Sequence, residues 1–171
     1  MKIAIVSDTH DNMATFNKAI SFLNAQKITT MVHCGDICNQ DTIDEAVKNF
    51  KGKIYFVRGN GDQSTQSLSA RPSTLKKCSG FGLDEVPEKL EIELGGKKIF
   101  FNHYPEISKA AAETGKYDLA FYGHTHRPWE ERIGNCRLVN PGELAGQRYK
   151  ACFAIYDTET DKLVLKILEL L

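Results

Sequence analysis

The chain has 171 residues, and its 22 basic and 22 acidic side chains cancel to a formal net charge of zero. This length suffices for one domain that buries a substantial core without disulfides, so we predict a single domain over residues 1–171. Neither sign of charge gathers in a long run, which argues against general nucleic-acid binding and against binding to a membrane surface.

The first part of the chain alternates between two hydrophobic periods. Residues 2–6 form a short apolar run that is typical of a buried parallel strand. A helix is predicted over 13–26, because its apolar side chains fall on one helical face: Phe16, Ala19, Ile20 and Leu23. A strand at 30–33, a helix at 42–50 and a strand at 53–57 follow. This order predicts a βαβαβ unit.

The later part is richer in predicted strands. Gly95 and Gly96 join strands at 89–94 and 97–101, which is a strong hairpin signal. A helix over 107–114 comes next, and the remaining predicted strands are 117–122, 129–133, 136–139, 151–156 and 163–168. The long polar connection over 63–87, with its glycines and prolines, is interpreted as a lid or a substrate-facing loop.

The cysteines and the N-terminus bear on the compartment. Five cysteines at irregular spacing do not outline a disulfide framework. No basic segment with an apolar signal core opens the chain, and no apolar stretch approaches the roughly 20 residues that span a bilayer. We therefore expect a cytoplasmic protein. Cys34 and Cys38 are close enough for a thiolate pair, but without a second pair we interpret them as small apolar groups.

Side chains that bind metals follow five of the predicted strands. In open α/β sheets, ligands gather beyond the carboxyl ends of the strands. The seven side chains at these ends are Asp8, His10, Asp36, Asn60, His103, His124 and His126. Asp8 and His10 stand two positions apart, so an extended chain would turn both toward one ion. A central carboxylate can bridge two cations. The set therefore predicts a two-metal centre.

One further histidine is interpreted differently. His33 lies inside an apolar run, one strand position before the loop that carries Asp36. A single histidine at a strand end is more often a hydrogen-bonded structural residue than a ligand. We assign His33 a role in the core or in support of the ligands.

The succession of these motifs resembles the calcineurin-like metallophosphoesterase superfamily, and the short chain resembles its compact bacterial and archaeal phosphodiesterase branch. The resemblance covers residues 3 to 142. It implies an α/β fold of two facing mixed β-sheets flanked by helices, an αββα sandwich. It also implies ligand roles: Asp8, His10 and His126 at one metal, Asn60, His103 and His124 at the other, and Asp36 bridging both. Asn140-Pro141-Gly142 is similar to a tripeptide that closes the back of the site.

The chain departs from the superfamily pattern near the third motif. Gly61 stands where most members carry a histidine that assists the transferring phosphoryl group or the leaving oxygen. Glycine offers no proton, so poor alkoxide leaving groups should suffer most. Asp62 then has no histidine to orient, and we interpret it as structural, with the binding of a water as the alternative. Tyr104 replaces the glycine that is more common after His103 and should narrow the pocket.

We expect metal-assisted hydrolysis of a phosphate ester, preferably a small phosphodiester, by a hydroxide that bridges two divalent ions. Imidazole suits zinc, iron or nickel and oxygen ligands suit manganese; the resemblance makes manganese the first choice. No protein nucleophile is required. Arg127 is a candidate phosphate contact, with a surface role as the alternative, and Asn12 is a candidate substrate contact, with helix N-capping as the alternative.

Two other functions stay open. The same branch is similar to a vacuolar sorting scaffold that uses this fold for protein binding, although a scaffold predicts eroded ligands and all seven positions are filled here. A nucleotide or dinucleoside-polyphosphate hydrolase would use the same metals. The sequence leaves open whether copies associate into a homo-oligomer.

Overall fold

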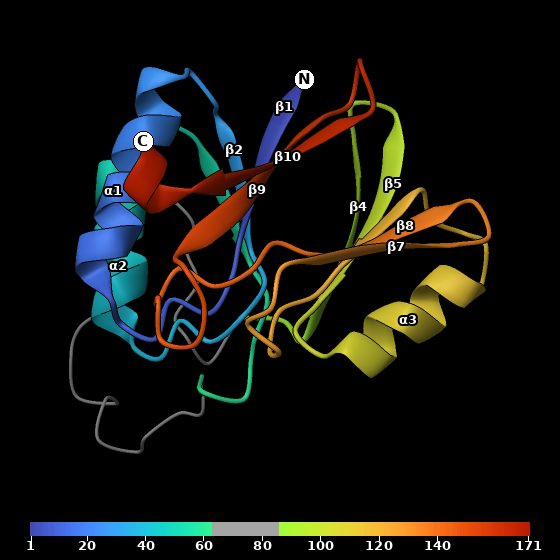
Figure 1. Ribbon diagram of the computed structural model, residues 1–171, viewed down its shortest axis with the longest axis horizontal. Helices are drawn as coiled ribbons and strands as arrows, with labels where there is room; N and C mark the ends of the chain where they lie inside the picture. The colour runs from blue at the N-terminus through green and yellow to red at the C-terminus, as the bar shows by residue number, and fades with distance from the viewer. Residues whose placement is uncertain (63–85) are drawn as a thin grey trace.

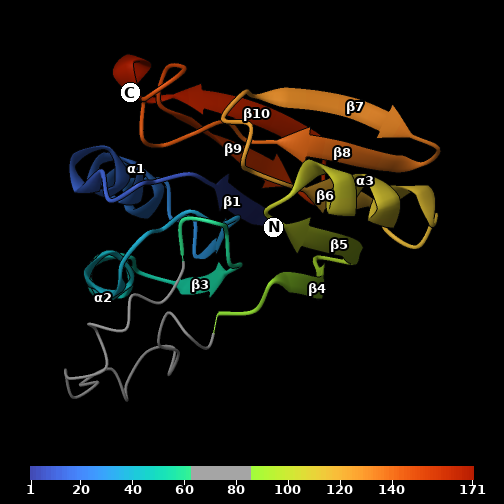
Figure 2. The same cartoon turned by 90° about the horizontal axis from the view of Figure 1, so that it is seen from below.

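The computed structural model describes residues 1–62 and 86–171. Two five-stranded sheets pack face to face, with helices on both outer faces (Figures 1 and 2). This confirms the predicted α/β sandwich of mixed sheets. The predicted lid over 63–87 lies, apart from its last two residues, outside the described residues.

The first sheet has the order β10-β9-β1-β2-β3. Its parallel strands are β1 (Lys2–Val6), β2 (Thr30–His33) and β3 (Lys53–Phe56), and α1 (Met13–Ala25) and α2 (Gln40–Asn49) connect them. Its antiparallel strands are β9 (Cys152–Asp157) and β10 (Lys162–Ile167), and a short 3-10 helix at Leu168–Leu170 ends the chain. The predicted βαβαβ unit is confirmed.

The second sheet has the order β4-β5-β6-β8-β7. The hairpin of β4 (Lys89–Leu94) and β5 (Lys97–Asn102) is followed by α3 (Pro105–Glu113), which covers the outer face of this sheet (Figure 1). The remaining strands are β6 (Leu119–Phe121), β7 (Trp129–Ile133) and β8 (Cys136–Asn140). Strands β5, β6 and β8 run parallel, so their carboxyl ends share one edge.

Two of the element boundaries differ from the prediction because capping sets them. Helix α2 begins at Gln40, two residues before the predicted start, because the side chain of Asn39 accepts a hydrogen bond from the Thr42 N–H. Helix α3 begins at Pro105, where the missing N–H of proline costs nothing at the first helical turn.

Three apolar layers hold the sandwich together. In β1, Ala4 and Val6 pack under α1 and α2, whereas Ile3 and Ile5 face the second sheet. The strand is apolar throughout because both of its faces are covered. A third cluster lies between the second sheet and α3. Among the described residues, we find no helix with the length and apolarity to cross a membrane.

Candidate metal centre

The loops after β1, β2, β3, β5 and β6 converge at the lower edge of the sandwich in Figure 1. The seven predicted ligands lie on these loops. The parallel strands explain the convergence, because their carboxyl ends meet at one edge of each sheet. The structure therefore brings together side chains that are up to 118 residues apart in the chain, from Asp8 to His126.

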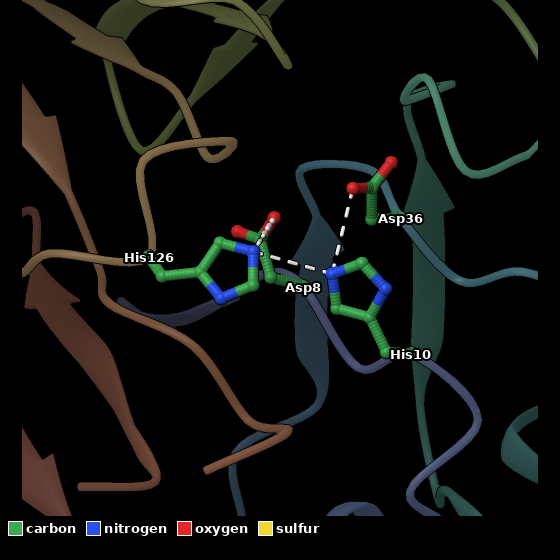
Figure 3. A group of neighbouring side chains, drawn as sticks. All are labelled: Asp8, His10, Asp36 and His126. Atoms are coloured by element: carbon green, nitrogen blue, oxygen red, sulfur yellow. Dashed lines mark hydrogen bonds and ion pairs between the residues drawn. The ribbon is translucent and has the colours of Figure 1, made fainter. Parts of the chain in front are cut away.

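A first group consists of Asp8, His10, Asp36 and His126, which turn toward one another in Figure 3. One ligand atom from each lies within 4.8 Å of all the others. The Nε2 atoms of His10 and His126 are 3.2 Å apart. His10 Nε2 is 3.5 Å from Asp36 Oδ2, and His126 Nε2 is 3.5 Å from Asp8 Oδ1. These separations surround a space that suits one cation.

A second group lies beside the first. Asn60 Oδ1 is 2.8 Å from His124 Nδ1 and 3.1 Å from His103 Nε2. His103 Nε2 is also 3.4 Å from Asp36 Oδ1. Asp36 therefore presents one oxygen to each group, because its Oδ2 faces His10 and its Oδ1 faces His103.

The buried carboxylate of Asp8 suggests what the first group is built to hold. Its side chain is fully buried, and among the described residues its Oδ2 atom has no hydrogen-bond partner. Burial raises the pKa of Asp8 from 3.8 to about 8. Its Oδ1 atom accepts from His124 N at 3.1 Å, but a buried carboxylate oxygen without a partner is costly, and a cation beside Oδ2 would remove that cost. Carboxylate and imidazole donors together fit a divalent transition metal.

Two histidines have a fixed tautomer. His126 Nδ1 lies 2.7 Å from Glu143 Oε2, and His103 Nδ1 lies 2.9 Å from the carbonyl oxygen of Cys34. Because these oxygens only accept, both Nδ1 atoms donate, and in the neutral ring each Nε2 atom then presents a lone pair to its ligand group. Burial also lowers the pKa of His103, which favours the neutral form that binds metal.

The ligand loops have an unusual backbone. Five predicted ligands have positive φ: Asp8 at 52°, His10 at 43°, Asp36 at 58°, His124 at 65° and His126 at 64°. A residue other than glycine pays for this conformation and keeps it only where its surroundings enforce it. Main-chain hydrogen bonds do so here, from Asp8 N to Gly35 O at 2.9 Å and from His10 N to Asp36 O at 3.0 Å.

Two glycines in the motifs are required by close approach. A Cβ atom on Gly59 would lie 2.2 Å from Asp36 Oδ1, and a Cβ atom on Gly123 would lie 2.7 Å from Asp8 Oδ2. Neither distance is tolerated. The glycines that precede Asn60 and His124 therefore let the loops approach the two carboxylates.

Two acidic residues support the ligands from behind. Asp62 accepts hydrogen bonds from the N–H groups of Asp36, Ile37, Cys38 and Gly59 at 2.6 to 3.0 Å, which agrees with the structural interpretation. Glu143 is fully buried against His126. Burial alone would raise the pKa of Glu143, but the N–H groups of Tyr149, Arg148 and Gln147 and the ring of His126 hold it below its usual value.

Glu143 was missed from the sequence. The available signal was its position directly after Asn140-Pro141-Gly142, in a loop predicted to close the site.

The two candidate substrate contacts, Asn12 and Arg127, contact other parts of the chain. Asn12 caps α1, since its Oδ1 accepts from Thr15 N at 3.3 Å, and its Nδ2 donates to the carbonyl of Ala145 at 2.9 Å. The guanidinium of Arg127 lies over the ring of Trp129, 5.1 Å from its centroid, on the exposed surface. The positions agree with helix N-capping for Asn12 and with a surface role for Arg127.

His33 is fully buried, and its ring packs against Phe16 and Phe56. Its Nδ1 accepts from Gly35 N at 3.2 Å, so its Nε2 donates to Thr9 Oγ1 at 2.5 Å. Burial lowers its pKa to about 4. The ring thus supports the two ligand loops in its neutral form.

A two-sheet sandwich with acidic, amide and imidazole side chains at its strand ends defines a class of metal-binding hydrolase folds. A family model for the calcineurin-like phosphoesterase superfamily domain matches residues 1–161. The chain belongs to this superfamily.

Similar proteins refine the comparison. The chain is 32% identical over 148 residues to phosphodiesterase MJ0936 of Methanocaldococcus jannaschii, which covers 85% of this chain and 86% of that protein. It is 26% identical over 179 residues to the probable metallophosphoesterase MJ0623 of the same archaeon, covering 98% and 81%. These relatives confirm the resemblance to the small archaeal and bacterial phosphodiesterase branch.

Solved structures agree with the fold. The structure of an archaeal phosphodiesterase superposes with a TM-score of 0.81 at 28% identity, covering 98% of this chain and 99% of that one. Wild-type Vps29 of Entamoeba histolytica, complexed with zinc, superposes with a TM-score of 0.68 at 18% identity, covering 96% and 90%. At that identity the second likeness shows the fold alone.

Proposed function

We propose that this chain is a metal-dependent phosphodiesterase with two divalent ions. The observation that carries the proposal is the position of Asp36, which turns one oxygen to each of two ligand groups. The similarity to a phosphodiesterase over most of both chains supports the substrate class.

The ligand roles follow from the two groups. Asp8, His10 and His126 would hold one ion, Asn60, His103 and His124 would hold the other, and Asp36 would serve both. Manganese is the first choice of metal, and zinc, nickel and iron are its competitors. Two such ions would withdraw charge from the phosphate oxygens and lower the pKa of a water molecule, so that hydroxide forms near neutral pH.

The chain's own residues set the direction of approach. Asp8 and His103 are fully buried and form the floor of the site, whereas the side chain of His10 is 23% exposed and His124 is exposed. A substrate therefore enters past His10 and His124. The buried floor excludes water from the side of the carboxylates, which strengthens their electrostatic effect.

A diester fits the charge of the site better than a monoester. A diester carries one negative charge at neutral pH, which two cations can match without additional arginines. Arg127, the basic residue next to the ligand His126, is held against Trp129. Gly61 provides no proton donor, so the leaving group must depart with little assistance.

The test is to strip the protein of metal with a chelator and to restore manganese, nickel, zinc and iron separately. Turnover of a chromogenic aryl phosphodiester should return with at least one metal and exceed that of the matching monoester. A dinucleoside polyphosphate in the same series tests the alternative substrate class. Negligible turnover with every metal and substrate would refute the enzyme and favour a protein-binding scaffold.

Asp36→Asn is the matched variant for the bridging role. It should lower turnover by about 100-fold or more, because an amide carries no charge between the two ions. Asp118→Asn is the control, since Asp118 lies exposed and its carboxylate accepts from the N–H of Lys98. Wild-type turnover of Asp36→Asn would contradict the assignment.

A further inference from the structure

Glu143 is a buried carboxylate outside the predicted ligand set. It lies in the segment between β8 and β9 and is fully buried. Its Oε2 atom accepts from His126 Nδ1 at 2.7 Å and from Gln147 N at 3.1 Å. Its Oε1 atom accepts from Arg148 N at 2.6 Å and from Tyr149 N at 2.5 Å. Three of these four donors are main-chain groups, so the carboxylate keeps its place independently of His126.

The segment that carries Glu143 is itself tied to a ligand loop. Leu144 N donates to Ser7 O at 3.0 Å, and Ala145 N donates to Asp8 O at 2.9 Å. The backbone of Glu143 is fixed as well, because its carbonyl accepts from Cys152 N at 2.8 Å. The carboxylate behind His126 and the carboxylate of Asp8 in front of it therefore belong to one hydrogen-bonded unit.

Two other imidazoles of the site, those of His103 and His10, have weaker support. His103 Nδ1 donates to the neutral carbonyl of Cys34 at 2.9 Å. His10 Nδ1 lies 3.5 Å from the thiol of Cys38. Among the described residues, Glu143 is the carboxylate that supports a predicted ligand through the ring atom facing away from the metal space. A carboxylate in this position orients the ring and increases the electron density at Nε2.

We propose that Glu143 is a positioning residue for His126 and makes the group of Asp8, His10, Asp36 and His126 the tighter of two unequal cation sites. This inference rests on the metal-binding part of the proposed function. The group with His126 has its own carboxylate, Asp8, a share of Asp36, and the charge of Glu143 behind the ring. The group with Asn60 has a neutral amide and shares Asp36. Opposite charge close to a partly buried cation favours binding, so the first group fills first.

Glu143→Gln tests the proposal through the tautomer of His126. An amide has one acceptor oxygen for four donors. If that oxygen accepts from the N–H groups of Arg148 and Tyr149, the amide nitrogen lies beside His126 Nδ1 and Gln147 N. The amide then donates to His126 Nδ1, and the N–H of Gln147 is the one donor that faces another donor. The opposite orientation leaves two main-chain N–H groups facing the amide nitrogen. The first orientation is therefore preferred, and it moves the His126 proton to Nε2, the atom that should bind metal.

The experiment has two readouts, neither of which needs a substrate. Nitrogen-15 NMR of the histidines in metal-free protein should show the Nδ1–H tautomer for His126 in the wild type and the Nε2–H tautomer in Glu143→Gln. Equilibrium titration with manganese should show two classes of site in the wild type. In Glu143→Gln the tighter class should weaken by about 10- to 100-fold, and the weaker class should change by less than about threefold.

Glu143→Asp and Glu88→Gln complete the design. Glu143→Asp keeps the charge, so it should keep the Nδ1–H tautomer and lose less than about tenfold in the tighter class. Glu88→Gln, on the exposed surface, should leave both classes unchanged. The proposal is overturned if wild-type His126 has the Nε2–H tautomer, or if a folded Glu143→Gln protein binds both equivalents as the wild type does. Should Glu143→Gln not fold, the wild-type tautomer and the affinities of Glu143→Asp decide. Absence of phosphodiesterase turnover, with these results intact, would refute only the proposed activity.

Discussion

Replacing Asp62 with asparagine should destabilise the fold strongly, although Asp62 is not itself a predicted metal ligand. The Asp62 carboxylate is 2% exposed and holds together the loops after β2 and β3. Its Oδ2 atom accepts from Asp36 N at 3.0 Å and Gly59 N at 2.7 Å, and its Oδ1 atom accepts from Ile37 N at 2.6 Å and Cys38 N at 2.7 Å. An asparagine oxygen can serve only one of these pairs.

The magnitude follows from the pair that is left without an acceptor. A hydrogen bond to a charged group contributes about 1.5 to 3 kcal/mol. Two lost bonds, reduced by some relaxation of the loops, should lower the free energy of unfolding by about 3 to 5 kcal/mol. For a chain of this length each kcal/mol shifts Tm by about 2 to 4 °C, so the melting temperature should fall by roughly 6 to 20 °C.

The assay is urea and thermal unfolding of metal-free protein, so that lost metal binding does not contribute. Asp118→Asn is the control, because Asp118 is exposed and its carboxylate accepts from Lys98 N at 2.8 Å, a bond that an asparagine oxygen can keep; it should cost less than about 1 kcal/mol. An Asp62→Asn protein within about 1 kcal/mol of the wild type would show that the four donors do not depend on the carboxylate.

Three further outcomes are expected. Gly123→Ala would place a Cβ atom 2.7 Å from Asp8 Oδ2 and should weaken metal binding, measured by equilibrium titration, by about tenfold or more. Gly134→Ala is the control: Gly134 has a positive φ, 57°, but a Cβ atom there would have no neighbour within 4 Å, so metal binding should not change. Because Gly61 offers no proton, turnover should fall steeply from aryl to alkyl phosphodiesters, and a flat dependence on leaving-group pKa would contradict this. Burial lowers the pKa of His33 from 6.5 to about 4, so the unfolded chain takes up a proton that the folded chain excludes. The contribution of His33 to stability, which is complete above pH 6.5, should therefore fall by about 3 kcal/mol toward pH 4. Urea unfolding at several pH values should show this fall as the difference between the wild type and His33→Gln, because the other titrating groups are common to both.

Much of the fold could be predicted because hydrophobic period and burial agree. All four apolar side chains expected on one face of the first helix are buried: Phe16, Ala19, Ile20 and Leu23. The strand Lys2–Val6 is buried from its second residue onward, as expected for a strand covered on both faces. The ends of helices and strands were less predictable, because they depend on helix capping and on strand pairing. The strand predicted over 117–122 is confined to Leu119–Phe121 by its pairing with β5 and β8.

The residue types of the candidate site could be predicted from the sequence, but the residues that hold the ligands in place could not. The seven ligand-type residues stand at strand ends, and a rule about strand ends suffices to bring them together. Glu143 acts through three N–H groups and a ring 17 residues away, which no local pattern encodes. Asn12 was ambiguous for the same reason, since only the tertiary structure shows that its amide is used by Thr15 and Ala145.

The cost of this site argues for its purpose. Positive φ at five predicted ligands costs on the order of 1 kcal/mol or more each, and the Oδ2 atom of Asp8 is buried without a hydrogen-bond partner among the described residues. The strained loops and the buried oxygen do not contribute to the stability of the sandwich. That stability comes from the apolar layers between the sheets and under the helices. Asp62 and Glu143 accept eight further hydrogen bonds, which keep the loops in place. Strain that is opposed by so many fixed contacts is a feature of preorganised sites, in which the ligands are held in position before the ion arrives. A surface used only for protein binding gains nothing from a strained loop under a buried carboxylate, and this difference favours the enzyme over the scaffold.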